Sequence, residues 1–207
     1  GEYGSMSSSW ADVDNDGDLD LFIANSLYFS EQNNQLFMND GDGSFSEVSD
    51  MSLVNDVGCS YSSSFTDYDN DGDLDLFVSN GYCSGTIQNF LYKNDGNGYF
   101  ERDLMSIPDF TTPCSFGAAW ADLDHNGFMD LVVSTCKNSS SAATPPNMIF
   151  MNEGNDNHWL KVKLLGTSSN RSAIGARILV TAMINGVEVT QRRDINAQDG
   201  YCSQNSM

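Results

Sequence analysis

Basic residues are scarce in this chain of 207 residues. It contains 9 Lys and Arg against 29 Asp and Glu, so its formal net charge is −20. A chain this acidic repels polyanions, which excludes nucleic acid and anionic membrane surfaces as expected partners. Long hydrophobic runs are also missing, because no apolar run approaches the roughly 18 residues that cross a bilayer. No membrane insertion is therefore expected.

Histidine, the most frequent acid–base catalyst, occurs only twice. His125 lies inside an acidic loop and is expected to face solvent, and His158 is expected to be structural. The segment GYCSG places Cys83 where an elbow nucleophile would lie, but no base accompanies it. No catalytic residue is assigned, and the protein is predicted not to be an enzyme.

The charge is distributed unevenly along the chain. Residues 1–156 contain 26 acids and 3 bases, whereas residues 157–207 contain 3 acids and 6 bases. This change in composition predicts a domain boundary near Asn157. The opening segment GEYGSMSSSW has no signal-peptide pattern and leads directly into a repeat, so we expect the sequence to be part of a longer or processed chain.

The acids are concentrated in a motif that recurs with a constant period of 55 residues. The sequences DVDNDGDLD, DYDNDGDLD and DLDHNGFMD begin at Asp12, Asp67 and Asp122. We name residues 12–20, 67–75 and 122–130 loop 1, loop 2 and loop 3. An aromatic residue lies two positions before each loop and is expected to pack between repeats; these residues are Trp10, Phe65 and Trp120. A metal-free acidic turn is the alternative, but clustered carboxylates without a cation repel one another.

The spacing within the motif is that of a calcium loop. Calcium takes about six to eight oxygen ligands, so side chains at positions 1, 3, 5 and 9 and a carbonyl at position 7 can converge on one ion, while Gly at position 6 permits the turn. Position 12, which is Glu in an EF-hand, is Ile23, Val78 or Val133 here and belongs to an expected strand. Magnesium is less favoured because it keeps several waters. We therefore predict three Ca²⁺ sites that are not EF-hands.

Each predicted site has four side-chain ligands and one backbone carbonyl. Loop 1 supplies the side chains of Asp12, Asp14, Asp16 and Asp20 with the carbonyl of Asp18. Loop 2 supplies those of Asp67, Asp69, Asp71 and Asp75 with the carbonyl of Asp73. Loop 3 supplies those of Asp122, Asp124, Asn126 and Asp130 with the carbonyl of Phe128. Since loop 3 brings one carboxylate fewer, we expect it to bind calcium most weakly.

Short strands are expected on both sides of each loop. The second repeat contains SYSSSFTD, LDLFVSN, NFLYKN and YFERDL, with the turn DGNG before the last. The first repeat matches it element for element, and the third matches until its last turn. Four short strands in about 50 residues are typical of a propeller blade. The sequence thus predicts an all-β fold: three blades of a partial β-propeller in residues 1–156 (about 1–55, 56–110 and 111–156), followed by a small β-rich domain in residues 157–207.

These repeats resemble FG-GAP/VCBS repeats, the calcium-loop blades of integrin-α-like propellers. Residues 157–207 resemble the ASPIC/UnbV domain through NHWLKVKLLGTSSNRSAIGARI and DGYCSQNS. The matching positions are His158, Trp159, Gly166, Ser169, Asn170, Arg171, Gly175, Ala176, Arg177, Gly200, Tyr201, Ser203 and Gln204. The combination is similar to the cartilage acidic protein family and its bacterial relatives. The closing Gly-Leu-Gly segment of the family is missing, so this domain is expected to be truncated at its C-terminus.

The resemblance implies a secreted, extracellular module for adhesion or matrix interaction, with an extracellular protein or glycan as its partner. Two alternatives stay open, a structural subunit of an extracellular assembly and an accessory propeller of a polysaccharide-degrading enzyme. Propellers close with about four to eight blades, so three blades leave exposed flanks. We expect the remaining blades to come from the same longer chain or from other copies.

Cysteines and sequons bear on the cellular compartment. Cys59 and Cys114 each precede the first strand of a blade, and Cys83 and Cys136 each follow the second. This parallel predicts the disulfides Cys59–Cys83 and Cys114–Cys136, although other connectivities and free thiols stay open. Cys202 would be left over, and disulfides would place the protein outside the reducing cytosol. The predicted glycosylation sites are the sequon residues Asn138 and Asn170.

Overall fold

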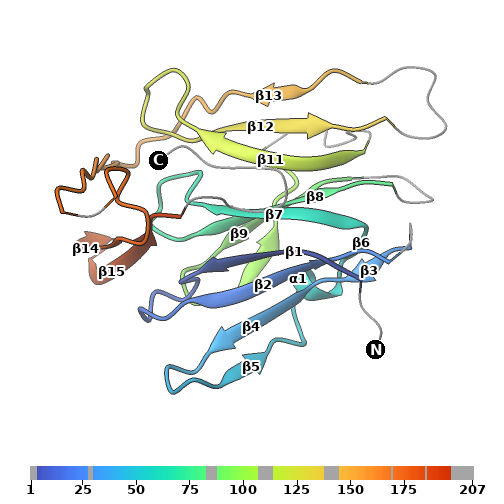
Figure 1. Cartoon of the computed structure of the whole chain (residues 1–207), viewed down its shortest axis with the longest axis horizontal. Helices are drawn as coiled ribbons and strands as arrows, with labels where there is room; N and C mark the ends of the chain where they lie inside the picture. Colours follow the sequence, from blue (N-terminus) through green and yellow to red (C-terminus); the bar gives the residue numbers. More distant parts are fainter. Residues whose placement is uncertain are drawn as a thin grey trace.

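The structure is a computed structural model that describes residues 4–27, 30–82, 88–106, 114–137, 145–168, 170–184 and 186–196. Three antiparallel sheets follow one another along the chain and stack as layers, and a separate hairpin lies at one end of them (Figure 1). The all-β fold with three blades of an unclosed propeller is as the sequence predicts.

Each blade is one antiparallel sheet in which strand order follows the sequence. Blade 1 contains β1 (Ser5–Ala11), β2 (Asp20–Asn25), β4 (Gln35–Asn39) and β5 (Phe45–Glu47). Blade 2 contains β7 (Ser60–Thr66), β8 (Asp75–Asn80), β9 (Phe90–Asn94) and β10 (Phe100–Arg102). Blade 3 contains β11 (Ser115–Ala121), β12 (Asp130–Thr135) and β13 (Met148–Phe150).

Three short elements were not predicted: β3 (Gln32–Asn33) lies between β2 and β4 of blade 1, and α1 (Ser52–Asn55) and β6 (Val57–Gly58) lie between blades 1 and 2. The strands β3 and β6 pair with each other, and α1 forms one helical turn whose Leu53 and Val54 are buried. Four residues are too few to give a helical period in the sequence. Within the described part of the chain, no helix is long and apolar enough to cross a membrane.

The first two strands of every blade pair in the same register. The equivalent facing pairs are Trp10 with Leu21, Phe65 with Leu76, and Trp120 with Leu131. Each first strand also has an irregularity near its start. A slip of one residue would turn every side chain to the opposite face. The shared register therefore gives loops 1 to 3 equivalent places at one end of the blades.

Apolar side chains between neighbouring blades form two cores. The first includes Val13, Phe22, Leu36, Leu76 and Phe100, and the second includes Tyr68, Phe77, Leu91, Trp120 and Leu131. The ring centroid of Phe65 lies 6.4 Å from that of Phe22 in blade 1, and that of Trp120 lies 6.3 Å from that of Phe77 in blade 2. These two aromatic residues pack between blades as expected.

Trp10 does not pack between blades, which corrects the expectation for the first repeat. Trp10 is 49% exposed, and its ring meets the edge of Phe45 in its own sheet, with 6.2 Å between ring centroids. No described blade covers this face of blade 1. At the other end of the stack, Ile149 of β13 is 60% exposed. Both observations agree with the exposed flanks predicted for an unclosed propeller.

The described part of the C-terminal segment contains one β-hairpin. β14 (Arg177–Ile184) and β15 (Val187–Asp194) form an antiparallel hairpin, but residues 157–168 form no strand. The hairpin lies at the end of the blades that carries the acidic loops (Figure 1). A Cβ atom on Gly72 of loop 2 would lie 2.6 Å from Cδ1 of Ile184 and 2.7 Å from Nε2 of Gln191. The hairpin and loop 2 are thus in direct contact.

Candidate metal centre

Loops 1 to 3 each connect the first and second strands of a blade through two residues in the left-handed region. The fourth loop residue has a φ of 59°, 55° or 65°, and the sixth has a φ of 97°, 104° or 91°; these residues are Asn15, Asn70, His125, Gly17, Gly72 and Gly127. Gly adopts positive φ without steric cost, and Asn tolerates it better than most residues. The Asn and Gly of loops 1 and 2 therefore permit the tight turn, and in loop 3 His125, which also tolerates positive φ, takes the place of Asn.

The turn brings three carboxylates together in each loop. The groups are Asp12, Asp14 and Asp20 in loop 1; Asp67, Asp69 and Asp71 in loop 2; and Asp122, Asp124 and Asp130 in loop 3. In each group, one oxygen of every member lies within 4.8 Å of the others. Asp16 of loop 1 and Asp75 of loop 2, also predicted as ligands, lie outside these closest groups.

The first aspartate of every loop has one buried oxygen without a hydrogen-bond partner in the described structure. These atoms are Oδ1 of Asp12, Asp67 and Asp122. The other oxygen of Asp12 accepts a bond from the Gly17 N–H at 3.2 Å, and that of Asp67 accepts one from the Gly72 N–H at 3.1 Å. A buried carboxylate oxygen without a partner is costly, and a divalent cation would satisfy it. The residues present therefore fit a cation in all three loops.

The ninth aspartate of each loop fixes the shape of the loop. Asp20 accepts hydrogen bonds from the backbone N–H of Val13 and of Asn39, both at 2.9 Å. Asp75 and Asp130 make the equivalent bonds, whose donors are Tyr68, Asn94, Leu123 and Asn152. All three carboxyls are buried. Because each carboxylate oxygen has two lone pairs, these groups can hold the loop and still face a cation.

Three asparagines that were not assigned to the sites hold the loops in place. Asn94, at the end of β9, donates from Nδ2 to the carbonyl of Leu74 in loop 2 at 3.1 Å and to that of Val13 in loop 1 at 2.7 Å. Asn152 makes the equivalent pair of bonds from blade 3 to loops 3 and 2. Asn39 donates from Nδ2 to the carbonyl of Leu19 in loop 1 at 3.1 Å, and the spacing of 55 residues between Asn39 and Asn94 was the signal in the sequence.

Side chains also connect neighbouring loops. Asn15 of loop 1 donates to Oδ1 of Asp73 in loop 2 at 2.9 Å, and Asn70 of loop 2 donates to the carbonyl of Gly127 in loop 3 at 3.1 Å. The carboxylate of Asp73 is therefore engaged by loop 1. The assignment of its carbonyl, and of those of Asp18 and Phe128, as metal ligands stays a prediction.

Asn126, the amide ligand predicted in loop 3, is held by its surroundings. Its Oδ1 accepts a bond from the Phe128 N–H at 2.8 Å, and its Nδ2 donates to the carbonyl of Asn152 at 2.7 Å. His125, its neighbour, is exposed as expected.

Burial raises the pKa of several carboxyls in loops 1 and 2, and the nearby like charges raise it further. The pKa is about 6 for Asp20, about 7 for Asp67 and about 9 for Asp75, against an ordinary value of 3.8. Desolvation is the largest cause in all three. It also raises the pKa of Asp12, Asp14, Asp71 and Asp73. Without a cation, Asp75 of loop 2 therefore retains its proton at neutral pH, and Asp67 retains its proton in part.

Loop 2 already holds a cationic side chain. The ammonium of Lys93 in β9 contacts Asp69 and lies 3.1 Å from Oδ2 of Asp71. Burial works against its charge, but the hydrogen bonds to the two carboxylates outweigh it and raise the pKa of Lys93. An ammonium between two carboxylates shows that this place in the loop suits positive charge.

Basic side chains of the C-terminal segment approach all three loops. Nη1 of Arg192 donates to the carbonyl of Gly17 in loop 1 at 2.6 Å. Two ion pairs reach the other loops. Arg193 pairs with Asp67 in loop 2 at 3.8 Å, and Lys161 pairs with Asp122 in loop 3 at 3.5 Å. The basic C-terminal segment is therefore complementary in charge to the acidic loops of the same molecule.

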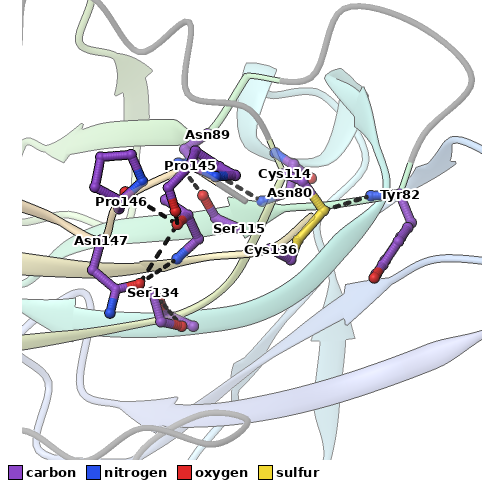
Figure 2. The surroundings of a disulfide bond; sticks show 12 residues. Asn80, Tyr82, Asn89, Cys114, Ser115, Ser134, Cys136, Pro145, Pro146 and Asn147 are labelled. Carbon is purple, nitrogen blue, oxygen red and sulfur yellow. Dashed lines mark hydrogen bonds between the residues drawn. A yellow bond between two sulfur atoms is a disulfide. The ribbon is translucent and has the colours of Figure 1, made fainter. Parts of the chain in front are cut away.

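The Cys114–Cys136 disulfide is present, as predicted. It joins the residues just before β11 and just after β12, at the end opposite loop 3, with 5.1 Å between the Cα atoms (Figure 2). Cys59 is buried and disulfide-bonded. Cys83 lies outside the described residues, so its pairing with Cys59 stays a prediction.

Only one of the two sequon asparagines lies in the part of the chain that the structure describes. Asn138 lies outside the described residues, as does Cys202. Asn170 is exposed, and its Nδ2, the atom that would carry a glycan, donates to the carbonyl of Ile174 at 2.9 Å. Its Oδ1 accepts a bond from the Ile174 N–H at 2.7 Å. The side chain shapes a turn, and glycosylation at both positions stays a prediction.

Comparison with known families agrees with this arrangement. The profile of the FG-GAP-like repeat matches residues 12–78 and again 67–133. The profile named ASPIC and UnbV matches residues 166–207. The two repeat matches begin at the first aspartates of loops 1 and 2, and the second includes loop 3. No match was found among curated proteins.

Proposed function

Because the chain belongs to the FG-GAP-like repeat family and ends in an ASPIC and UnbV segment, we propose that it is a calcium-binding β-propeller module that acts outside the cell in adhesion or matrix interaction. The β-propeller-like architecture is its scaffold. Calcium binding, the extracellular location and the binding role form the proposal.

One observation carries the calcium assignment. The same buried oxygen, Oδ1 of the first aspartate, lacks a hydrogen-bond partner in all three loops. Oxygen-only ligands on a flexible loop suit calcium better than magnesium, which demands octahedral geometry and keeps its waters. When bound, calcium supplies the positive charge that holds the carboxylates of one loop together. The chain's residues supply the converging oxygens and the buried hydrogen bonds that fix the loop.

The disulfide supports the extracellular location. Disulfides such as Cys114–Cys136 persist in oxidising compartments and are rare in the cytosol. Extracellular calcium, at millimolar levels, also suits sites of modest affinity.

We propose binding rather than catalysis as the role, with an extracellular protein or glycan as partner. The buried carboxyls of the loops are ordered as cation ligands and backbone acceptors, which leaves them no separate role as acid and base. A structural subunit of an extracellular assembly is the second candidate. The exposed flanks favour it, since Trp10 and Ile149 offer apolar surface that further blades, from a longer chain or from other copies, would bury.

Thermal unfolding tests the calcium part of the proposal. A ligand that binds only the folded state stabilises it by RT ln(1 + [L]/Kd), so the melting temperature should rise steadily with calcium and less with magnesium. An unchanged melting temperature across the calcium titration would contradict it.

For the partner, a glycan array and a pull-down from extracellular extract distinguish a glycan ligand from a protein ligand. Growth of ordered oligomers without either would favour the assembly role.

A further inference from the structure

Loops 1 and 2 form a matched pair within one molecule. Their predicted side-chain ligands are the same four aspartates, at positions 1, 3, 5 and 9. They differ in the residue that precedes the loop-holding asparagine at the end of the third strand. That residue is Met38 in β4 of blade 1, Lys93 in β9 of blade 2 and Met151 beside β13 of blade 3. At this position, loop 2 therefore has a cationic side chain nearby and loop 1 has an uncharged one.

Lys93 occupies the oxygens of Asp69 and Asp71 that the backbone leaves available. Oδ1 of Asp69 accepts a bond from the Asp71 N–H at 3.3 Å, and Oδ1 of Asp71 accepts one from the Asp73 N–H at 3.1 Å. Oδ2 of both carboxylates faces the Lys93 ammonium. The free oxygens at positions 3 and 5 of loop 2 thus already have a cationic partner.

Loop 1 has the same backbone bonds without the lysine. Oδ1 of Asp14 accepts a bond from the Asp16 N–H at 3.3 Å, and Oδ1 of Asp16 accepts one from the Asp18 N–H at 2.8 Å. Met38 can neither donate to Oδ2 nor neutralise it. The closest acidic group also differs, since it includes Asp20 in loop 1 but Asp71 in place of the ninth aspartate in loop 2. The lysine therefore coincides with a different arrangement of the carboxylates.

We propose that Lys93 is a tethered counter-ion that competes with the metal for Asp69 and Asp71, and that it lowers the calcium affinity of loop 2 below that of loop 1. This inference rests on the proposed calcium function. A divalent cation at these oxygens must displace the ammonium or lie beside it, and both cost free energy. The Lys93 side chain is 45% exposed, so it can withdraw into solvent when the metal binds. Loop 1 then fills at lower calcium concentrations than loop 2.

The competition has a second consequence when calcium is absent. Three carboxylates within 4.8 Å repel one another, and the ammonium neutralises part of that charge. Lys93 should therefore stabilise the metal-free protein while it weakens the metal-bound one. Removing the ammonium should change stability in opposite directions in chelator and in calcium. A purely structural lysine would not produce this change of sign.

Reciprocal substitutions test the proposal by calorimetric titration with calcium chloride. In the Asp12→Ala/Asp122→Ala background, which leaves loop 2, Lys93→Met should raise calcium affinity on the order of tenfold. In the Asp67→Ala/Asp122→Ala background, which leaves loop 1, Met38→Lys should lower it by a similar factor. Methionine occupies the equivalent positions 38 and 151, so the fold should accept methionine at position 93. In the otherwise unchanged chain, Lys93→Met should narrow the difference between the calcium affinities of loops 1 and 2, with Arg193 still beside Asp67 of loop 2.

Two results would overturn the inference. One is an unchanged or weaker affinity of loop 2 in Lys93→Met while loop 2 still binds calcium, which would limit Lys93 to a structural ion pair. The other is the absence of calcium binding in loop 1 as well, which would refute the proposed function and this inference with it. The expected independent sign is a melting temperature of Lys93→Met that is below that of the wild type in chelator and above it in saturating calcium.

Discussion

Single residues in the acidic loops have properties that depend on whether a cation is present. Asp20, Asp67 and Asp75 are carboxyls whose pKa is raised by burial to about 6, 7 and 9. In an unfolded chain an Asp titrates near 3.9. The folded, metal-free protein therefore binds protons that the unfolded chain has already released.

This difference predicts an unusual pH dependence for metal-stripped protein. Because the folded pKa values exceed the unfolded one, the stabilisation by protonation is fully present below about pH 4 and is lost as the pH rises through about 6 to 9. The melting temperature of stripped protein should fall between pH 5 and pH 8, and saturating calcium should remove most of the fall by favouring the ionised carboxylates. Scanning fluorimetry at several pH values measures both series. A melting temperature of stripped protein that rises over this range would contradict the burial argument.

Pairs of elements explain how the loops keep their shape. Asn94 links two blades, since its buried amide donates to the carbonyls of Val13 and Leu74. Asn94→Ala leaves both carbonyls unsatisfied and should lower the free energy of unfolding by about 2 kcal/mol. Urea unfolding in calcium measures this change. Asn97→Ala, in the exposed turn of the same blade, is the matched control and should change the value by no more than about 0.5 kcal/mol. Equal effects of the two substitutions would refute the bridging role.

The disulfide of blade 3 closes β11 and β12 at the end opposite loop 3. It spans 22 residues of sequence, and closing a chain segment of this length restricts the unfolded state by about 3 kcal/mol. The double substitution Cys114→Ser/Cys136→Ser should therefore lower the free energy of unfolding by about that amount in calcium. Cys202→Ser serves as the control for loss of a thiol. A double variant as stable as the wild type would show that loop 3 and the strand pairing alone hold the blade.

Sequence patterns predicted some elements and not others, for physical reasons. The strands beside loops 1 to 3 were predictable because period-2 alternation and a repeat of 55 residues reinforce each other. The helix α1 and the strands β3 and β6 are too short to have a period. The contacts of Lys93 and Arg192 were not predictable, because they depend on how strands and segments distant in sequence meet in space. Trp10 fits the repeat but lacks a described neighbouring blade to cover it.

At the scale of the whole molecule, the basic C-terminal segment is docked on the acidic end of the propeller. Arg192 is 6% exposed and bonds to Gly17 of loop 1, and Arg193 lies beside Asp67 of loop 2. The opposite charges of residues 1–156 and 157–207 thus help to hold the C-terminal segment against loops 1 and 2.

Removing these two charges should loosen the contact. In Arg192→Met/Arg193→Met, amide hydrogen exchange should become faster in β14, in β15 and in loops 1 and 2, because fewer bonds hold them closed. Arg171→Met, at an exposed position of the same segment, removes charge without touching a loop and is the control. The same exchange rates in the double variant and the wild type would show that the contact with Gly72 holds the hairpin without its arginines.

We propose that each of the three loops binds one calcium ion through the aspartate whose buried oxygen lacks a hydrogen-bond partner. The most direct test of this proposal is the calcium content of the protein after dialysis against buffer with a known free calcium concentration, measured by mass spectrometry of the metal. We expect three ions in the wild type and two in each of Asp12→Asn, Asp67→Asn and Asp122→Asn. The triple variant should retain none, while its metal-free form should be at least as stable as the wild type, because buried charges have been removed. No calcium in the wild type, or three ions retained in the triple variant, would contradict the account.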